Sequence, residues 1–120
     1  MAQILVVDDD ELVRSLAAET LRQDGHLVTE AADGQEGLAQ FRASRADLVL
    51  ADLVMPVKEG IEMIMELRRE YPDTKIIAMS GVVHCHNYLQ IAEKLGALRS
   101  LGKPFTKDGL LYAVDEALGL

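Results

Sequence analysis

Four apolar segments of the chain are each followed by side chains suited to metal or phosphoryl chemistry. Asp8–Asp10 follow the first of these segments, and Asp52 follows the second. Ser80 follows the third, and Lys103 comes shortly after the fourth. Carboxylates, a hydroxyl and an ammonium group at the ends of four strands would form a site for a cation and a phosphoryl group.

Three of the carboxylates are expected to lie close together. Asp8, Asp9 and Asp52 would repel one another at short range unless a cation entered the site. A hard dication with oxygen ligands fits such a set, and we expect Mg²⁺. A carboxylate can also act as a nucleophile and form an aspartyl phosphate. The metal and Lys103 would then neutralise charge on the transferring group, and Ser80 would hydrogen-bond a phosphoryl oxygen.

The same residues also have structural interpretations. Asp10 can cap a helix that begins after it, which would account for one of three consecutive aspartates. Lys103 on its own would be a surface lysine, but its position before Pro104 suggests a cis peptide bond that holds the lysine inward. Ser80 taken alone favours neither interpretation.

The hydrophobic pattern alternates between strand and helix along the whole chain. We expect strands at residues 3–7, 27–31, 48–51, 75–79 and 98–101. We expect helices at residues 11–23, 35–43, 60 to about 70, about 86–95, and a last helix capped by Thr106. Leu12, Leu16 and Leu21 are expected on the inner face of the first helix, and Leu38 and Phe41 on that of the second.

Five strand–helix units predict an α/β fold, a doubly wound parallel sheet with helices on both faces. The first, third and fourth strands lack alternation, as expected for strands covered on both sides. Ligands of such sheets bind beyond the carboxyl ends of the strands, at the topological switch point. The candidate residues all lie at those ends, so the fold and the site agree although they were inferred from different features.

Composition limits the classes of function. A chain of 120 residues is long enough for a hydrophobic core, and we expect one domain over residues 1–120. A net charge of −8 argues against direct binding of nucleic acid, and permits binding of cations or basic protein surfaces. No apolar stretch approaches the roughly 18 residues of a membrane span, and no signal peptide is recognisable. Together with the single Cys85, this predicts a cytoplasmic protein without membrane contact.

Four short motifs surround the candidate residues. They are Val6-Val7-Asp8-Asp9, Asp52-Leu53-Val54-Met55-Pro56, Ser80-Gly81 and Lys103-Pro104-Phe105. In order and spacing the chain resembles bacterial response-regulator receiver domains, the CheY-like modules of two-component signalling. Each motif is weak alone, but jointly they are highly specific, and the resemblance spans the whole chain. It implies a five-stranded sheet of strand order 2-1-3-4-5.

The resemblance implies a role for each acidic residue. Asp52 would accept a phosphoryl group from the phosphohistidine of a sensor histidine kinase or phosphotransfer protein. Mg²⁺ would be bound directly by Asp9 and partly through water by Asp8. Asp52 and the backbone carbonyl of Val54 would complete the protein ligands.

The resemblance also implies how the signal is read. Ser80 would move toward the phosphoryl group, and Lys103 would pair with it. A downstream effector domain or protein would read the change on the face made by the fourth helix, fifth strand and fifth helix, as a population shift between two packings. The aspartyl phosphate would then hydrolyse, so the protein would be a phosphoacceptor and not a multiple-turnover enzyme.

The chain departs from the family pattern near its fifth strand. Ser100 stands where the family usually has Tyr or Phe, three residues before the lysine, so the aromatic switch is missing. Tyr88 or Tyr112 could replace it, although both are more readily interpreted as partly buried helix residues. Glu59 stands where the family usually has Asp, which is a mild change.

Two valines stand at positions where polar side chains of the family steer the attacking water. Val54 and Val82 offer no hydrogen bond to that water, which predicts slow dephosphorylation. A half-life shorter in the wild type than in a Val54→Asn variant would count against this hypothesis.

Histidines occur at two places in the chain. His84-Cys85-His86 follows Ser80, but adjacent residues point in different directions, so we interpret the group as a polar loop in preference to a soft-metal site. His84 could still tune access to the site or its pH response. His26 follows Asp24-Gly25 and is expected to be a solvated turn residue.

Other classes of protein stay open as alternatives. A haloacid-dehalogenase-type phosphatase would share the Asp8–Asp10 spacing, but Leu12 stands at the last position of its motif, and the chain has no room for a cap. A pseudo-receiver, which keeps the fold and binds partners without chemistry, is supported only by Ser100. Nucleotide-binding glycine motifs do not occur.

The assembly in which the chain works is less constrained. Met1 lies two residues before the first strand, so the start looks natural. The chain is expected to be a stand-alone receiver or one cut from a longer regulator, and a monomer or weak dimer.

Overall fold

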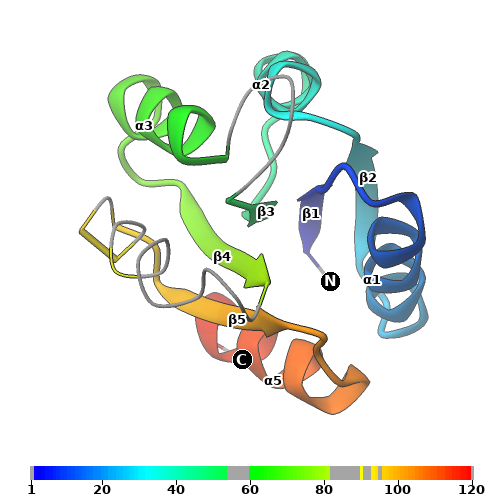
Figure 1. The fold of residues 1–120 in the computed structure, drawn as a ribbon. Helices are drawn as coiled ribbons and strands as arrows, with labels where there is room; N and C mark the ends of the chain where they lie inside the picture. Colours follow the sequence, from blue (N-terminus) through cyan, green and yellow to red (C-terminus); the bar gives the residue numbers. More distant parts are fainter. Residues whose placement is uncertain (1, 54–59, 82–89, 91–92, 95, 120) are drawn as a thin grey trace.

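The computed structural model describes residues 2–53, 60–81, 90, 93–94 and 96–119. Five parallel strands form one sheet in the order β2-β1-β3-β4-β5 (Figure 1). The strands are β1 (Gln3–Val7), β2 (Leu27–Ala31), β3 (Leu48–Asp52), β4 (Lys75–Gly81) and β5 (Arg99–Lys103). The helices are α1 (Glu11–Gln23), α2 (Gly34–Ala43), α3 (Gly60–Glu70) and α5 (Lys107–Leu118). The predicted doubly wound fold and strand order are confirmed.

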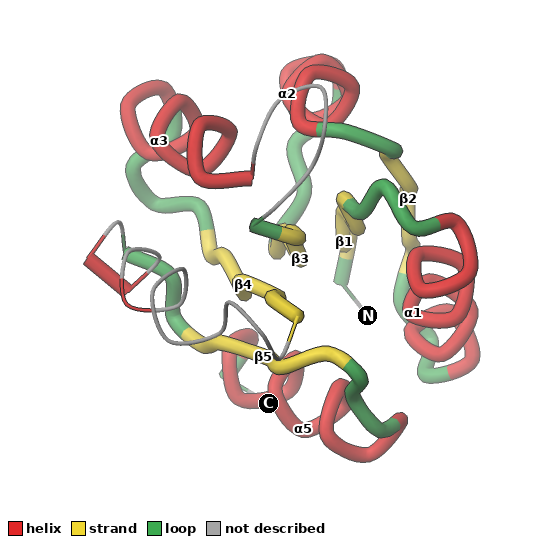
Figure 2. The backbone as a smooth tube through the Cα atoms, in the orientation of Figure 1, coloured by secondary structure: helices red, strands yellow, loops and turns green. Residues whose placement is uncertain are grey.

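The sheet is buried on both faces. Figure 2 shows α2 and α3 on one side of the sheet, with α1 and α5 on the other. One core cluster includes Phe41 of α2 and Ile64 of α3, and the other includes Leu21 of α1 and Val114 of α5. Because alternate side chains of β1, β3 and β4 enter both clusters, these strands need apolar residues at consecutive positions.

Side-chain caps begin three of the described helices. Asp10 accepts hydrogen bonds from the backbone N–H groups of the first turn of α1, as predicted. Asp33 caps α2, and Thr106 caps α5, which also confirms its prediction. Each cap satisfies N–H groups that have no partner within the helix, so the start of each helix is fixed by one local residue.

The predicted inner face of α1 is wrong at two positions. Leu12 and Leu16 are 83% and 60% exposed, whereas Ala17 and Leu21 are fully buried. Successive helical residues are about 100° apart, so the stripe through positions 12 and 16 cannot face the core together with that through 17 and 21. Small alanines let α1 approach the sheet, and the larger leucines before them are left on the surface.

Two other burial predictions are wrong. His26 is 6% exposed instead of solvated, because its Nδ1 accepts a hydrogen bond from the backbone N–H of Ala2 at 3.1 Å, beside the start of β1. Tyr112 is 58% exposed, since its ring lies on the outer side of α5 against the guanidinium of Arg99, 5.3 Å from the ring centroid.

The observed boundaries of β4 and β5 differ slightly from the predicted ones. β4 continues to Gly81 and β5 begins at Arg99 and ends at Lys103, because the two strands pair in register from Ile77–Arg99 to Gly81–Lys103. The helix predicted at about 86–95 lies mostly outside the described residues. Within the described part of the chain, no helix is long and apolar enough to traverse a bilayer.

Candidate functional site

Asp52 is the last residue of β3 and is held in place by the chain that follows it. The side chain is buried, with the residue 5% exposed. Gly60, the first residue of α3, lies directly over its backbone, since a Cβ atom at position 60 would be 1.9 Å from the carbonyl oxygen of Asp52. The N–H of Gly60 donates to the carbonyl of Leu53 at 3.2 Å. The start of α3 and the backbone of Asp52 therefore hold each other in place, and no residue with a Cβ atom fits at position 60.

Asp8 is fully buried at the end of β1. Its backbone N–H donates to the carbonyl of Ala31 at 3.1 Å, and its Oδ1 accepts from the N–H of Asp10 at 2.9 Å. The guanidinium of Arg14 donates to the Asp8 carbonyl at 2.9 Å. One carboxylate oxygen is thus used to shape the loop, and Oδ2 is left to face the site.

Lys103 connects the two buried carboxylates. Its Nζ lies 2.7 Å from Oδ2 of Asp8 and 3.0 Å from Oδ2 of Asp52. Burial alone lowers the pKa of Lys103, but hydrogen bonds and charge from both aspartates offset it, so the pKa is raised and the ammonium stays protonated. The peptide bond between Lys103 and Pro104 is cis, as the sequence suggested.

The acidic set can hold a metal ion. Carboxylate oxygens of Asp8, Asp9 and Asp52 all lie within 4.8 Å of one another. Among the described residues, three carboxylates lie around the single ammonium group of Lys103, which is the one charged partner of Asp8 Oδ2. An all-oxygen set with excess negative charge fits a hard dication such as Mg²⁺, which prefers carboxylate and water ligands.

Ser80 is fully buried near the end of β4, paired in register with Gly102 next to Lys103. Among the described residues, its hydroxyl donates a single long hydrogen bond of 3.4 Å, to the carbonyl of Gly81. A hydroxyl so weakly engaged can turn to a better acceptor at this edge of the sheet.

The structure therefore brings Asp8, Asp9, Asp52 and Lys103 together and places Ser80 at the same edge. Ser100 is exposed on β5, opposite Ala78 of β4. Several positions named from the sequence lie outside the described residues: Val54, Glu59, Val82, His84, Cys85, His86 and Tyr88.

Sequence reasoning missed two residues that shape the site. Gly60 was expected only as a helix start, and its contact with the backbone of Asp52 has no local signal beyond the glycine itself. Arg14 was not singled out, although a basic residue one turn after an acidic loop can reach back to its carbonyl groups, as it does at Asp8.

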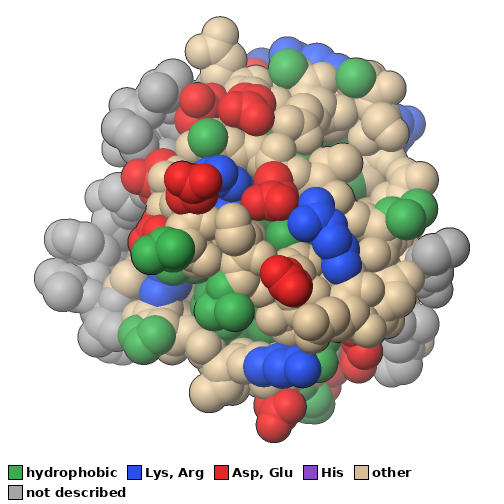
Figure 3. Space-filling view, turned by 90° about the vertical axis from the view of Figure 1, so that its right-hand side faces the viewer, with side chains coloured by type: hydrophobic (Ala, Val, Ile, Leu, Met, Phe, Trp, Pro, Cys, Tyr) green, Lys and Arg blue, Asp and Glu red, His purple; other side chains and the backbone are tan. Residues whose placement is uncertain are grey.

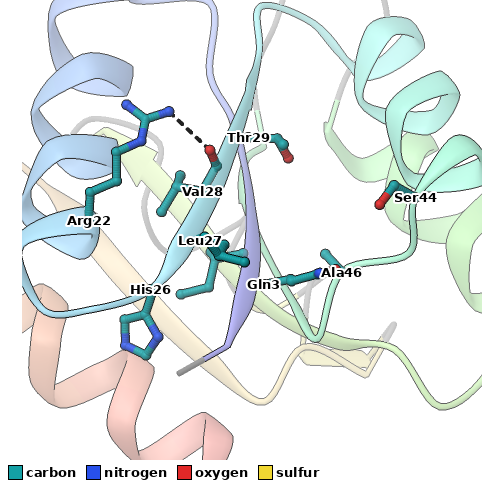
Figure 4. Close-up of a pocket in the computed structure, with 9 residues that line it drawn as sticks. Gln3, Arg22, His26, Leu27, Val28, Thr29, Ser44 and Ala46 are labelled. Atoms are coloured by element: carbon teal, nitrogen blue, oxygen red, sulfur yellow. Dashed lines mark hydrogen bonds between the residues drawn. The ribbon is translucent and has the colours of Figure 1, made fainter.

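A cavity of about 410 Å³ lies away from the carboxylates, beside the edge strand β2 (Figure 4). Arg22 closes one side of this edge by donating to the carbonyl of Val28 at 3.0 Å. Gln40 donates in the same way to the carbonyl of Glu30 at 2.8 Å. The residues of the candidate site, Asp8, Asp9, Asp52, Ser80 and Lys103, do not line this cavity, although the buried His26 does. The side chains of Arg22 and Gln40 mainly protect the sheet edge.

The face that carries α1 has no continuous patch of one charge. Figure 3 shows acidic, basic and apolar side chains interspersed on this side of the molecule. The described residues of this face thus form no basic stripe of the kind that binds phosphate backbones.

Comparison with known proteins identifies the family. The family model "Response regulator receiver domain" matches residues 4–115. The chain therefore belongs to the response-regulator receiver domain family, as its motifs indicated.

Several named relatives match nearly the full length of the chain. The chemotaxis protein CheY of Halobacterium salinarum is 33% identical and covers 97% of this chain and 96% of its own length. Sporulation initiation phosphotransferase F of Bacillus subtilis is 32% identical, with coverage of 98% and 94%. The structure of CheY4 from Vibrio cholerae superposes with a TM-score of 0.91 at 33% identity, over 98% of this chain and 99% of that one.

The chain also matches parts of longer regulators. The DNA-binding transcriptional regulator NtrC of Azospirillum brasilense is 32% identical over 98% of this chain, which spans only 24% of that protein. Receiver domains thus occur both alone and fused to other domains among these relatives.

Proposed function

We propose that this chain is a phosphoacceptor receiver domain in which Asp52 takes a phosphoryl group from the phosphohistidine of a sensor histidine kinase or phosphotransfer protein. The observation that carries the proposal is the ion pair of Lys103 with Asp52 and Asp8 inside an acidic cluster at the carboxyl ends of the strands. Membership of the receiver family and the similarity to a sporulation phosphotransferase support it.

The reaction is an in-line displacement at phosphorus. A carboxylate oxygen of Asp52 forms the new O–P bond as the N–P bond to the donor histidine breaks, and the bonding electrons return to the imidazole. Lys103 already contacts Oδ2 of Asp52 at 3.0 Å, so it is placed to neutralise charge on the transferring group. Ser80 then donates its hydroxyl proton to a phosphoryl oxygen.

Mg²⁺ would be held by Asp8, Asp9 and Asp52 together with the backbone carbonyl of Val54, and when bound it supplies charge neutralisation of the phosphoryl oxygens. Without a dication, like charges oppose the approach of an anionic donor. The dependence on metal thus follows from the excess of carboxylates over ammonium groups at the site.

The output would act through β5, α5 and the segment between β4 and β5. Ser100 supplies no aromatic ring that could be buried on activation. Instead, Arg99 stacks on Tyr112 and pairs with Glu116, and the Tyr112 hydroxyl donates to Glu116 at 2.6 Å. A partner protein that binds the face of β5 and α5 would therefore contact these exposed polar side chains.

We also propose where this domain works and in which oligomeric state. Residues 1–120 act as one domain in the cytoplasm, as a monomer or weak dimer without direct contact to nucleic acid or membrane. The chain promotes its own phosphorylation and dephosphorylation and does not turn over substrates repeatedly.

Intact mass after incubation with acetyl phosphate tests the proposal. We expect the mass of one phosphoryl group to be added in the presence of Mg²⁺, and no addition with EDTA or in Asp52→Asn. Asp73→Asn, which alters an exposed acid elsewhere, should be modified like the wild type. A folded wild type that gains no mass would favour the pseudo-receiver, a module that binds partners without phosphorylation.

A further inference from the structure

A histidine and two carboxylates meet at the end of the sheet opposite the acidic cluster. Asp24 is the C-terminal cap of α1, His26 immediately precedes β2, and Asp115 lies on α5. One ligand atom from each residue lies within 4.8 Å of the others, and Nε2 of His26 is 3.6 Å from Oδ2 of Asp24. Two segments distant in sequence, the turn between α1 and β2 and the helix α5, thus bring metal-binding atoms close together.

The imidazole of His26 is buried with one nitrogen unused. Its side chain is 3% exposed, and Nε2 has no hydrogen-bond partner among the described residues. Figure 4 shows the ring turned away from the other cavity residues and toward α5, the helix that carries Asp115. A buried ring nitrogen that lies 3.6 Å from a carboxylate oxygen without a hydrogen bond is unusual, because such groups are nearly always paired.

We propose that Asp24, His26 and Asp115 form a second metal site, selective for a transition-metal dication of the Zn²⁺ type. Metal bonds of about 2.0–2.1 Å in tetrahedral geometry place ligand atoms about 3.3 Å apart. The distance of 3.6 Å between Nε2 and Oδ2 of Asp24 needs little contraction. Asp24 is 42% exposed at its side chain, so ions can enter and water can complete the coordination.

The ligand types separate this site from the acidic cluster. Imidazole favours Zn²⁺ and similar metals, whereas an all-carboxylate set favours Mg²⁺. The second site lies where β2 begins, and the first lies where β1 and β3 end. A metal here would cross-link the end of α1 to α5, and the effect on stability would depend on metal concentration.

The hydrogen bond from the backbone N–H of Ala2 to His26 should compete with metal binding. Because Nδ1 accepts from the N–H of Ala2 at 3.1 Å, the neutral ring carries its proton on Nε2. Coordination through Nε2 moves that proton to Nδ1, so the Ala2 N–H must turn to water. The Ala2 amide therefore weakens metal binding, and removing it should strengthen binding.

The test is a Zn²⁺ titration of the full chain in excess Mg²⁺, followed through the ¹⁵N signals of the histidine rings. We expect Nε2 of His26 to change from protonated to metal-bound, with Nδ1 becoming protonated. His26→Asn and Asp115→Asn should each lower affinity at this site by about 100-fold or more, since even outer-shell changes lower it 10–100-fold. His84→Asn is the matched control and should retain the binding.

Ala2→Pro removes the competing N–H and should raise the affinity, by up to about tenfold. Unchanged His26 ring signals at saturating Zn²⁺, with zinc bound only elsewhere, would overturn the proposal. Affinity in Ala2→Pro equal to or below that of the unaltered chain would contradict coordination through Nε2.

Discussion

Replacing Lys103 by Met should destabilise the metal-free protein, because it leaves two buried carboxylates without their cation. The Nζ atom contacts Asp8 at 2.7 Å and Asp52 at 3.0 Å. At an effective dielectric constant of 20, unit charges about 3 Å apart attract by about 5 kcal/mol per contact before desolvation is subtracted. Measured losses for removing one partner of a buried pair are about 3–5 kcal/mol.

The net loss of unfolding free energy in Lys103→Met should be smaller than about 3–5 kcal/mol. The side chains of Lys103 and Asp52 are 17% and 8% exposed, so water weakens the interaction between their charges. We therefore expect a loss of about 2–3 kcal/mol in the free energy of unfolding at neutral pH with EDTA. With m-values of about 1–3 kcal/mol per molar urea, the midpoint should fall by about 1–2 M. Lys107→Met, which removes an exposed lysine on α5, should change stability by less than about 0.5 kcal/mol.

Mg²⁺ and a second substitution distinguish this cause from lost packing. Saturating Mg²⁺ should narrow the difference between Lys103→Met and the wild type, because the variant lacks the competing ammonium and binding to the native state adds stability. Asp8→Asn in the Lys103→Met background should restore part of the loss, as contacting residues are not additive. The reasoning is refuted if the loss is below about 0.5 kcal/mol in EDTA, or if neither Mg²⁺ nor Asp8→Asn changes it.

Three further outcomes are expected. Gly60→Ala should destabilise the protein by about 3 kcal/mol or more, because a Cβ there would overlap backbone, whereas Gly102→Ala, with open space at its Cβ, should be tolerated in urea unfolding. Leu21→Ala should lower the free energy of unfolding by about 2–5 kcal/mol and Leu16→Ala by less than about 0.5 kcal/mol, since only the first side chain is buried. The raised pKa of Lys103 contributes stability that is complete below its ordinary value of 10.5 and is lost as pH rises through the raised value. Between these two pH values, the free energy of unfolding should therefore fall less steeply with pH in Lys103→Met than in the wild type.

The fold and the main site could be predicted because both depend on local order along the chain. Consecutive apolar residues in β1, β3 and β4 report burial on two faces, and parallel pairing then brings Asp8, Asp52 and Lys103 to one edge. These inferences need only the identity of the residues and the direction of the strands.

Burial of individual side chains could not be predicted in the same way. Leu16 is apolar and spaced at helical intervals, yet it is exposed, and Ala17 beside it is buried in the core. His26 follows a turn, yet the backbone N–H of Ala2, at the start of the neighbouring strand β1, holds its ring inside. Both outcomes depend on how elements distant in sequence pack, which the local pattern does not contain.

The two ends of β5 carry different sets of polar contacts. At the carboxyl end, Lys103 is shared by Asp8 and Asp52, so a charge added to Asp52 must compete for the same ammonium group. β5 also carries the exposed Arg99–Tyr112–Glu116 contacts at its start. A shift of Lys103 along β5 would reach these contacts through one short strand that is only partly buried. Under the proposed function, and because Ser100 supplies no aromatic ring, we expect β5 to be the link between the acidic site and this surface.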